Sequence, residues 1–268
     1  MAGEGSIDGG APEGATNGET GVETGGADAR RYGDIHAPSY DALFDGREDV
    51  ELVARTLHEL VADGTDALEL GVGTGRLAIP LSARGVRVHG VDHSEPMLER
   101  LRAKVGPERV VPVRGDFRTV RVEAPVSLVF CAFSSLFMLP DQDAQVRTVA
   151  NAAAHLGPGG RLLVECFVHD RTRFVNDQEI VALDVADDSA TFRMTVLAPN
   201  DQVLRIQKVG LAGGEVRFLP NRLRFVYPSE LDLMARLAGL EPEFRWSDWE
   251  RRAFTARSAN LVAVYRKP

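Results

Sequence analysis

The sequence predicts an α/β protein built on a doubly wound, mostly parallel β-sheet, with an antiparallel β insertion after the fifth strand. Over residues 66–167, short apolar runs alternate with amphipathic segments, as strands and covering helices do. Residues 126–133 are apolar except for Ser127, which is typical of a strand covered on both faces. After Asp170 the helical period is lost, and short alternating runs between turn residues indicate antiparallel strands.

The individual elements follow from the same periodicities. A first helix is expected at 49–62, where apolar residues recur at helical spacing until Asp63-Gly64. The parallel part is expected to contain strands at 67–70, 86–91, 110–113, 126–133 and 161–167, and helices at 77–83, 96–105 and 141–156. The insertion is expected to contain strands at 191–197, 203–209, 215–219 and 222–226, and the chain to end with a helix at 228–238 and strands at 243–246 and 261–265.

Four segments result from these patterns. Residues 1–28 contain almost no apolar side chain larger than alanine, so we expect a disordered, acidic, glycine-rich tail. Residues 29–170 are expected to form an N-terminal flap and a ligand-binding α/β core. Residues 171–227 are expected to form the antiparallel insertion, as a substrate cover or a dimer face, and residues 228–268 to complete the core sheet.

The charge distribution favours a small-molecule ligand. The formal net charge is −8, but residues 1–28 hold six of the 39 acidic residues and no basic one. The remaining 33 acidic residues face 31 basic ones, so the folded part is nearly neutral. Because it has no basic surplus to neutralise phosphates, nucleic acid is not an expected partner.

Cysteine usage and hydropathy indicate a cytoplasmic protein. Cys131 and Cys166 both lie in apolar runs, which favours two buried thiols over a disulfide. We expect no membrane partner, because neither a signal peptide nor a long uncharged apolar run is present. No metal site is expected, because no Cys or His pair has ligand spacing. A homodimer is compatible with these features.

The strongest motif is a glycine turn after the first parallel strand, Glu69-Leu70-Gly71-Val72-Gly73-Thr74-Gly75. Its glycines let the backbone turn sharply and approach a ligand closely. A dinucleotide fingerprint would need glycine where Arg76 stands, and no Gly-Lys-Ser/Thr follows to form a phosphate loop. The acid at Glu69 disfavours a pyrophosphate and suits a cationic ligand. The alternative is a turn that only packs a helix on a strand.

Acid-x-Gly-x-Gly-x-Gly resembles the first motif of class I S-adenosylmethionine-dependent methyltransferases. This resemblance implies a Rossmann-like, mostly parallel seven-stranded sheet and S-adenosylmethionine as cofactor. It also implies that Asp92, at the end of the second strand, binds the ribose hydroxyls, and that Asp116 and Phe117 meet the adenine. Both acids have ordinary alternatives, a solvated strand cap and a turn. The Leu-x-Pro-Gly-Gly turn at 156–160 also resembles the family.

A narrower resemblance covers the flap, residues 133–136, the insertion and the C-terminus. These segments are similar to small-molecule methyltransferases of bacterial secondary metabolism, including sugar N,N-dimethyltransferases. In those enzymes a tyrosine closes over the cofactor, and Tyr40 matches it. A histidine near the acceptor amine corresponds here to Met138, which departs from the pattern. We expect methyl transfer to a small metabolite, with nitrogen favoured over oxygen and carbon. A nicotinamide-dependent oxidoreductase and a non-catalytic S-adenosylmethionine-binding protein are the alternatives.

Methyl transfer from a sulfonium requires positioning more than acid–base chemistry. His169, Glu165 and Tyr40 are the catalytic candidates, with His36 and Tyr32 as rivals. His169 has a suitable pKa but could equally be a surface residue. An aromatic and methionine cluster is expected to wall the site or to belong to the core, and comprises Phe133, Phe137 and Met138. The cofactor-binding candidates are Tyr40, Glu69, Gly71, Gly73, Thr74, Gly75, Asp92, His93, Met97, Asp116, Phe117, Cys131 and Phe133.

Overall fold

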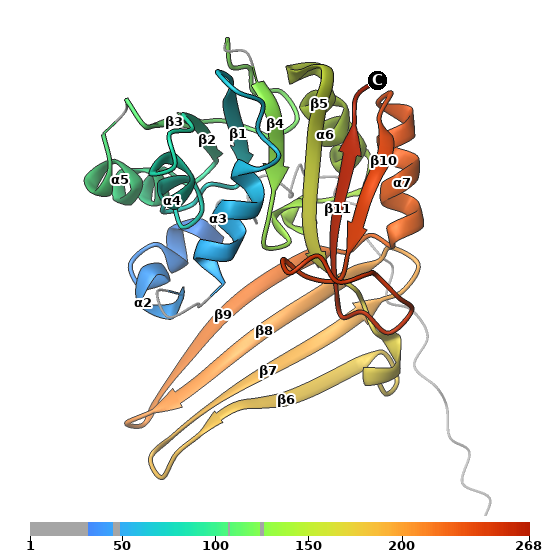
Figure 1. Ribbon diagram of the computed structural model, residues 1–268. Helices are drawn as coiled ribbons and strands as arrows, with labels where there is room; N and C mark the ends of the chain where they lie inside the picture. The colour runs from blue at the N-terminus through green and yellow to red at the C-terminus, as the bar shows by residue number, and fades with distance from the viewer. Residues whose placement is uncertain (1–31, 45–48, 107, 124–125) are drawn as a thin grey trace, which may run out of the picture.

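The computed structural model describes residues 32–44, 49–106, 108–123 and 126–268, and it contains two β-sheets (Figure 1). The tail predicted at 1–28 lies outside these residues. The larger sheet has seven strands in the order β10-β11-β5-β4-β1-β2-β3. The bounds are β1 Asp66–Leu70, β2 Val88–Asp92, β3 Val110–Arg114, β4 Val126–Cys131, β5 Leu156–Phe167, β10 Glu241–Trp246 and β11 Asn260–Arg266. The predicted fold class is confirmed.

The direction of the strands places one edge of this sheet for ligand binding. Strands β1 to β5 pair in parallel, and β11 runs antiparallel to both β5 and β10. The sheet order reverses between β1 and β4, because β2 and β3 lie on one side of β1 while β4 and β5 lie on the other. In open α/β sheets the crevice outside the carboxyl ends at such a switch point is where ligands bind.

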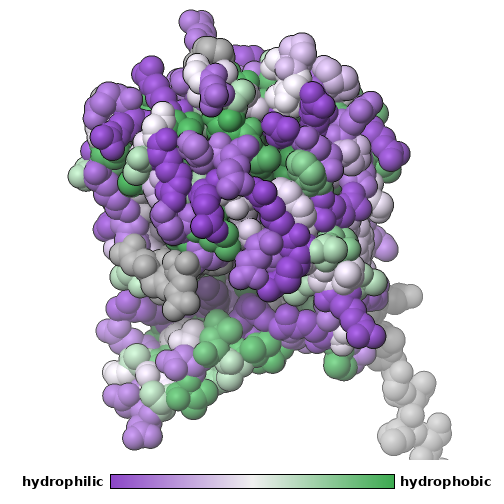
Figure 2. All heavy atoms as spheres, viewed as in Figure 1, coloured by the Kyte–Doolittle hydropathy of each residue, from purple (hydrophilic) through white to green (hydrophobic). Residues whose placement is uncertain are grey.

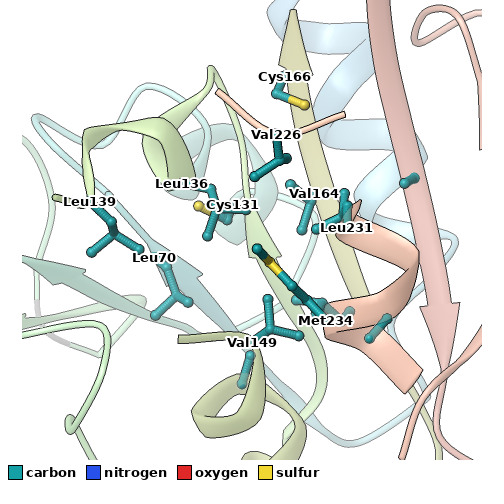
Figure 3. Packing of buried hydrophobic residues seen from close by; sticks show 14 of the residues in the cluster. Leu70, Cys131, Leu136, Leu139, Val149, Val164, Cys166, Val226, Leu231 and Met234 are labelled. Carbon is teal, nitrogen blue, oxygen red and sulfur yellow. The ribbon is translucent and has the colours of Figure 1, made fainter. Parts of the chain in front are cut away.

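Helices cover both faces of the sheet, and each face has its own apolar cluster. On β4, Val129 and Cys131 face the cluster formed with α6 and α7, whereas Leu128 and Phe130 face the one formed with α3, α4 and α5. Figure 3 shows the first cluster, with Met234 packed between strands and helix. The bounds are α2 Tyr40–Phe44, α3 Val50–His58, α4 Ala78–Ser82, α5 Glu95–Lys104, α6 Gln142–His155 and α7 Pro228–Leu237. No helix in the described part is both long and apolar enough to span a bilayer.

The insertion forms the second sheet, in the order β6-β7-β8-β9, with every pair antiparallel. Its bounds are β6 Gln178–Val185, β7 Ser189–Ala198, β8 Val203–Ala212 and β9 Glu215–Arg224. It leaves the carboxyl end of β5 and lies across the lower edge of the parallel sheet in Figure 1. Figure 2 shows hydrophobic residues gathered over this sheet.

Three sequence expectations about strands are wrong in detail. Strand β6 was not expected: it is an edge strand in which only Glu179 and Val181 are partly buried, and its sequence lacks a clean alternation. The separate strands expected at 215–219 and 222–226 are one strand, because Pro220 lies in an edge strand, where proline is tolerated. The glycine turn expected at 157–160 belongs to β5, since the chain there bonds to Lys267 through Gly159 N–H and Gly160 C=O.

A buried polar network joins β9 to the core helices. Arg224 is 5% exposed and donates to Gln145 Oε1 on α6 at 2.5 Å and to Glu230 Oε1 on α7 at 2.6 Å. Glu230 also accepts hydrogen bonds from Gln142 and Gln202, each at 2.7 Å. The network therefore fixes the insertion against the edge of the sheet where the strands end.

Candidate functional site

The three glycines of the turn after β1 have different surroundings: two are packed closely against neighbouring side chains, and one faces open space. Gly71, Gly73 and Gly75 all have positive φ, at 91°, 54° and 90°. A Cβ on Gly71 would lie 2.6 Å from Ser135 Oγ, and one on Gly75 would lie 2.5 Å from Leu101 Cδ1. A Cβ on Gly73 would meet nothing within 4 Å, so this position opens toward the space where a ligand can bind.

Alanine at Gly75 should therefore mainly reduce stability, and alanine at Gly73 should mainly reduce ligand affinity. We expect Gly75→Ala to lower the free energy of unfolding by about 1–2 kcal/mol, because it adds a crowded Cβ at positive φ. Gly73→Ala should destabilise less and should weaken S-adenosylhomocysteine binding more. Urea denaturation and calorimetry on both variants measure the two quantities. If both variants lost the same stability and the same affinity, the proposed difference between Gly75 and Gly73 would be contradicted.

Asp92 ends β2 opposite the glycine turn. Its Oδ2 accepts a hydrogen bond from the Gly73 N–H at 2.9 Å, and its Oδ1 accepts one from the Ser94 N–H at 2.9 Å. Burial raises the pKa of this carboxyl, although the backbone N–H groups around it oppose that rise. A carboxylate has about four acceptor lone pairs, so each oxygen can still accept a ligand hydroxyl. The residues present therefore fit a nucleoside ribose.

A cavity of about 680 Å³ lies along these carboxyl ends and is called the first cavity. The structure brings most of the predicted cofactor-binding residues, together with Glu165, to its wall. Those that line it are Tyr40, Gly71, Gly73, Asp92, His93, Met97, Phe117, Phe133 and Glu165. The predicted residues that do not line it are Glu69, Thr74, Gly75, Asp116, Cys131 and His169.

Glu69 lies beneath the turn rather than in the cavity wall. It is 4% exposed, and its Oε2 has no hydrogen-bond partner in the described part of the chain. Burial raises its pKa to about 8, while the neighbouring charge of Arg76 opposes the rise. Its carboxyl is therefore mostly protonated at neutral pH. Cys131 is also fully buried, and burial raises the pKa of its thiol.

Two other predicted residues are engaged by protein partners. The Asp116 carboxylate accepts three side-chain hydrogen bonds from Arg118, at 2.5 to 3.0 Å, which hold its pKa below the usual value. Thr74 donates from Oγ1 to Asp41 Oδ1 at 2.6 Å, and Lys104 donates to the same oxygen at 2.7 Å. Thr74 thus ties α2 of the flap to the glycine turn.

The turn after β4 is held in a strained conformation by Glu165. Phe133 and Ser134 have φ of 54° and 59°, values that are uncommon for non-glycine residues. The Phe133 N–H donates to the Glu165 carboxylate, and the Ser134 N–H donates to the Glu165 carbonyl at 3.0 Å. Arg76 stacks on the Phe133 ring, 4.8 Å from its centroid. These contacts place Phe133 against the first cavity.

The three residues of the predicted aromatic and methionine cluster do not share one environment. Phe133 and Met138 line the first cavity. Phe137 is instead fully buried and packs edge-on against Phe167, with ring centroids 5.0 Å apart. It belongs to the hydrophobic core, one of the two alternatives for this cluster.

A second cavity, of about 740 Å³, lies between the insertion sheet and the carboxyl end of β5. Its wall includes His169, Tyr32 and His36, the last two with ring centroids 4.2 Å apart. The surface alternative for His169 is wrong, because this residue is 8% exposed and stacks on Phe225 at 4.1 Å. Burial lowers its pKa, and its Nε2 has no hydrogen-bond partner within the described residues.

The two cavities adjoin. Five residues line both of them, namely Tyr32, Phe167, Asn221, Leu223 and Asn260. Sequence reasoning missed the last four of these. For Asn221 and Leu223 the available signal was the alternation of the insertion strands, which places polar residues such as Thr195 and Asn221 on the face that carries Leu204 and Leu223.

Comparison with known proteins agrees with the fold. A family of methyltransferase domains matches residues 67–160. The CcbJ methyltransferase from Streptomyces caelestis is 40% identical, with a TM-score of 0.83 over 90% of this chain and 99% of that one. The cypemycin N-terminal methyltransferase of a Streptomyces species is 29% identical over 218 residues, 81% of this chain and 89% of the relative. A dTDP-3-amino-3,4,6-trideoxy-α-D-glucopyranose N,N-dimethyltransferase of Streptomyces venezuelae is 31% identical over 135 residues, 48% of this chain and 56% of the relative.

The doubly wound sheet, the glycine turn and a carboxylate at the switch point define an α/β protein that binds a nucleoside. The chain belongs to the class I S-adenosylmethionine-dependent methyltransferases. It is an enzyme that uses S-adenosylmethionine. The nicotinamide-dependent and non-catalytic alternatives are therefore set aside.

Proposed function

We propose that this enzyme methylates an amine nitrogen of a small metabolite in bacterial secondary metabolism. In this proposal the first cavity holds S-adenosylmethionine and the second holds the acceptor. The observation that carries it is the junction of the two cavities, whose five shared residues are uncharged. An acceptor in the second cavity would then lie next to a methyl group in the first, across a junction whose shared lining residues carry no charge.

The proposed cofactor-binding residues are those that line the first cavity. Asp92 would accept hydrogen bonds from the ribose, and the open side of Gly73 would let the backbone approach the cofactor. Tyr40 would close over it from the flap, and burial raises the pKa of its hydroxyl, which therefore stays neutral. Phe117 would flank the adenine.

Methyl transfer to a neutral amine requires little acid–base catalysis. S-adenosylmethionine supplies an activated methyl group, and the enzyme mainly has to hold the acceptor nitrogen behind it. A neutral amine already carries the attacking lone pair, so no base needs to act at that moment. Glu165 is better placed to orient Phe133 and Ser134 than to remove a proton, because its carboxylate is bonded to that turn. We therefore assign it a positioning role.

Nitrogen is favoured as the acceptor by the relatives. The names of the cypemycin enzyme and the aminosugar enzyme describe methylation at an N-terminus and at a sugar nitrogen. Met138 stands at the position where the aminosugar enzymes that this chain resembles have histidine. It lines the first cavity. This departure favours an amine on a scaffold other than those sugars.

The direct test is label transfer. The enzyme is incubated with methyl-labelled S-adenosylmethionine and matched pairs of amines and alcohols that share one carbon skeleton. Label should enter the amines. Transfer only to the alcohols, or no transfer to any pair despite S-adenosylhomocysteine binding, would contradict the proposal.

One observation supports O-methylation as a second candidate. His169 is a buried imidazole in the wall of the second cavity, and its lowered pKa keeps it neutral and able to accept a proton at pH 7. A hydroxyl acceptor would need such a base, and a neutral amine would not.

His169→Gln should separate the two candidates. For an amine acceptor we expect the rate to fall less than about tenfold; for a hydroxyl acceptor the loss of a general base should lower it by about 10²- to 10⁴-fold. The acidic limb of the wild-type profile for a hydroxyl acceptor should lie below pH 6.5, because burial lowers the pKa of His169 and activity is lost as pH falls through that value. That limb should disappear in the variant. Single-turnover rates measured across pH check both points.

A further inference from the structure

Asn221 lies on β9 where the two cavities meet, and its side-chain carbonyl is unused. The residue lines both cavities, and its Oδ1 is buried with no hydrogen-bond partner in the described part of the chain. Because a buried carbonyl without a partner destabilises a fold, such an atom indicates a partner that arrives with the substrate. We propose that Asn221 Oδ1 accepts a hydrogen bond from the N–H of the reacting amine and orients its lone pair toward the cofactor.

The structure holds Asn221 firmly in place. The next residue, Arg222, donates from Nη1 to the Pro140 carbonyl at 2.7 Å. Two residues further, Arg224 is bonded to Gln145 and Glu230 on the core helices, and its own carbonyl accepts from Gln145 Nε2 at 2.8 Å. This half of β9 is therefore fixed to the core, as a preorganised acceptor requires.

A neutral amide suits this position better than a carboxylate. A carboxylate beside the amine would favour its protonated form, which has no lone pair with which to attack. At the junction of the two cavities the shared residues are uncharged, and Glu165, which lines only the first cavity, is bonded to the Phe133 N–H. Asn221 can accept from the amine N–H without raising the amine pKa as strongly as an acid would.

The same hydrogen bond should be strongest in the transition state. The nitrogen lone pair forms the new bond to the methyl carbon, and the carbon–sulfur bond breaks with its electron pair remaining on sulfur. The nitrogen becomes positively charged, so the hydrogen bond from its N–H to Asn221 Oδ1 becomes charge-assisted. The ammonium product then loses its proton to water.

This inference rests on the proposed function and narrows the substrate class. The acceptor must carry an N–H while it attacks, so it is a primary or secondary amine that enters uncharged. A tertiary amine has no hydrogen to offer Asn221, and is not expected to be an acceptor.

The test uses binding probes rather than turnover. Two analogues of S-adenosylmethionine carry nitrogen in place of the sulfonium, with either a 2-aminoethyl or a propyl group in place of the methyl. The aminoethyl arm puts an N–H group near the position of the acceptor nitrogen. By calorimetry on the full chain, the wild type should bind the aminoethyl probe at least about tenfold more tightly than the propyl probe.

Asn221→Leu should abolish most of this ratio and leave S-adenosylhomocysteine affinity within about twofold, because only the acceptor oxygen is lost. Asn221→Asp should raise the ratio, since the hydrogen bond gains a charged acceptor. Gln207→Leu, an amide removed from the opposite face of β8, is the matched control and should leave the ratio unchanged.

The possible failures are distinguishable. A wild-type ratio near one, or a ratio that Asn221→Leu leaves unchanged, would overturn the role of Asn221 while leaving the proposed function intact. Failure of the wild type to bind S-adenosylhomocysteine would overturn the assignment of the first cavity, and with it both proposals. If Asn221→Leu does not fold, Asn221→Asp alone decides, because its predicted effect has the opposite sign.

Discussion

Replacing Glu230 by alanine is expected to lower the free energy of unfolding by about 3–5 kcal/mol, the range for breaking a buried ion pair by removing one partner. The side chains of Arg224 and Glu230 are 7% and 14% exposed, and they are bonded at 2.6 Å. Without the carboxylate, the Arg224 guanidinium would remain buried without its counter-charge. Gln142 and Gln202 would also lose an acceptor. Urea denaturation at neutral pH measures the loss.

A matched control comes from the same sheet. Glu215 on β9 pairs with Arg217 at 3.6 Å, but the two side chains are 75% and 81% exposed. Solvent screens such a pair, so Glu215→Ala should leave the free energy of unfolding unchanged within the error of the titration. Equal effects of the two substitutions would show that burial of the Glu230 pair is not what matters.

The effect of Glu230 should also depend on pH in one direction. Burial raises the pKa of this carboxyl, but the hydrogen bonds from Arg224, Gln202 and Gln142 outweigh it and leave the pKa below 4.5. A lowered pKa means that the carboxylate stabilises the fold fully above pH 4.5, and that this contribution is lost as pH falls through the folded-state value. The difference between wild type and Glu230→Ala should therefore shrink below pH 4.5.

The sequence predicts the sheet better than it predicts the acceptor site. The parallel strands show continuous apolar runs because helices cover both faces, and this signal is local. Edge strand β6 lacks it, since only Glu179 and Val181 on this strand are partly buried. The glycine turn could be predicted because positive φ at Gly71, Gly73 and Gly75 restricts the residue type.

The second cavity could not be predicted, because it is formed by packing between distant segments. Asn221 and His169 are separated by most of the insertion, and the docking of β9 through Arg224, together with the stacking of His169 on Phe225, brings their elements to one wall. The adenine contact expected of Asp116 stays a prediction, and the sequence does not reveal that Arg118 bonds to the same carboxylate.

Replacing Asp92 by alanine is expected to weaken S-adenosylhomocysteine binding by about 1.5–3 kcal/mol, the range for hydrogen bonds to a charged group, or about 10- to 150-fold in affinity. The carboxylate would contribute twice. It would accept from the ribose, and it already holds the turn by accepting from the Gly73 and Ser94 N–H groups. Asp92→Asn keeps one acceptor oxygen and should lose less. Calorimetry on both variants measures the difference, and unchanged affinity in Asp92→Ala would refute the assignment.

The pH dependence of S-adenosylhomocysteine affinity tests whether the negative charge of Asp92, in addition to its hydrogen-bonding geometry, contributes to binding. Burial raises the pKa of this carboxyl above its ordinary value of 3.8 in the free enzyme. Because the ionised form is the better acceptor, affinity should fall as acidification protonates Asp92, and this loss should begin above pH 3.8. Asp92→Asn cannot titrate, so this loss should be absent from it. The buried carboxyl of Glu69, with its pKa of about 8, is common to both proteins. The ratio of their affinities across pH therefore isolates Asp92, and a ratio that stays constant under acid would show that its charge does not hold the nucleoside.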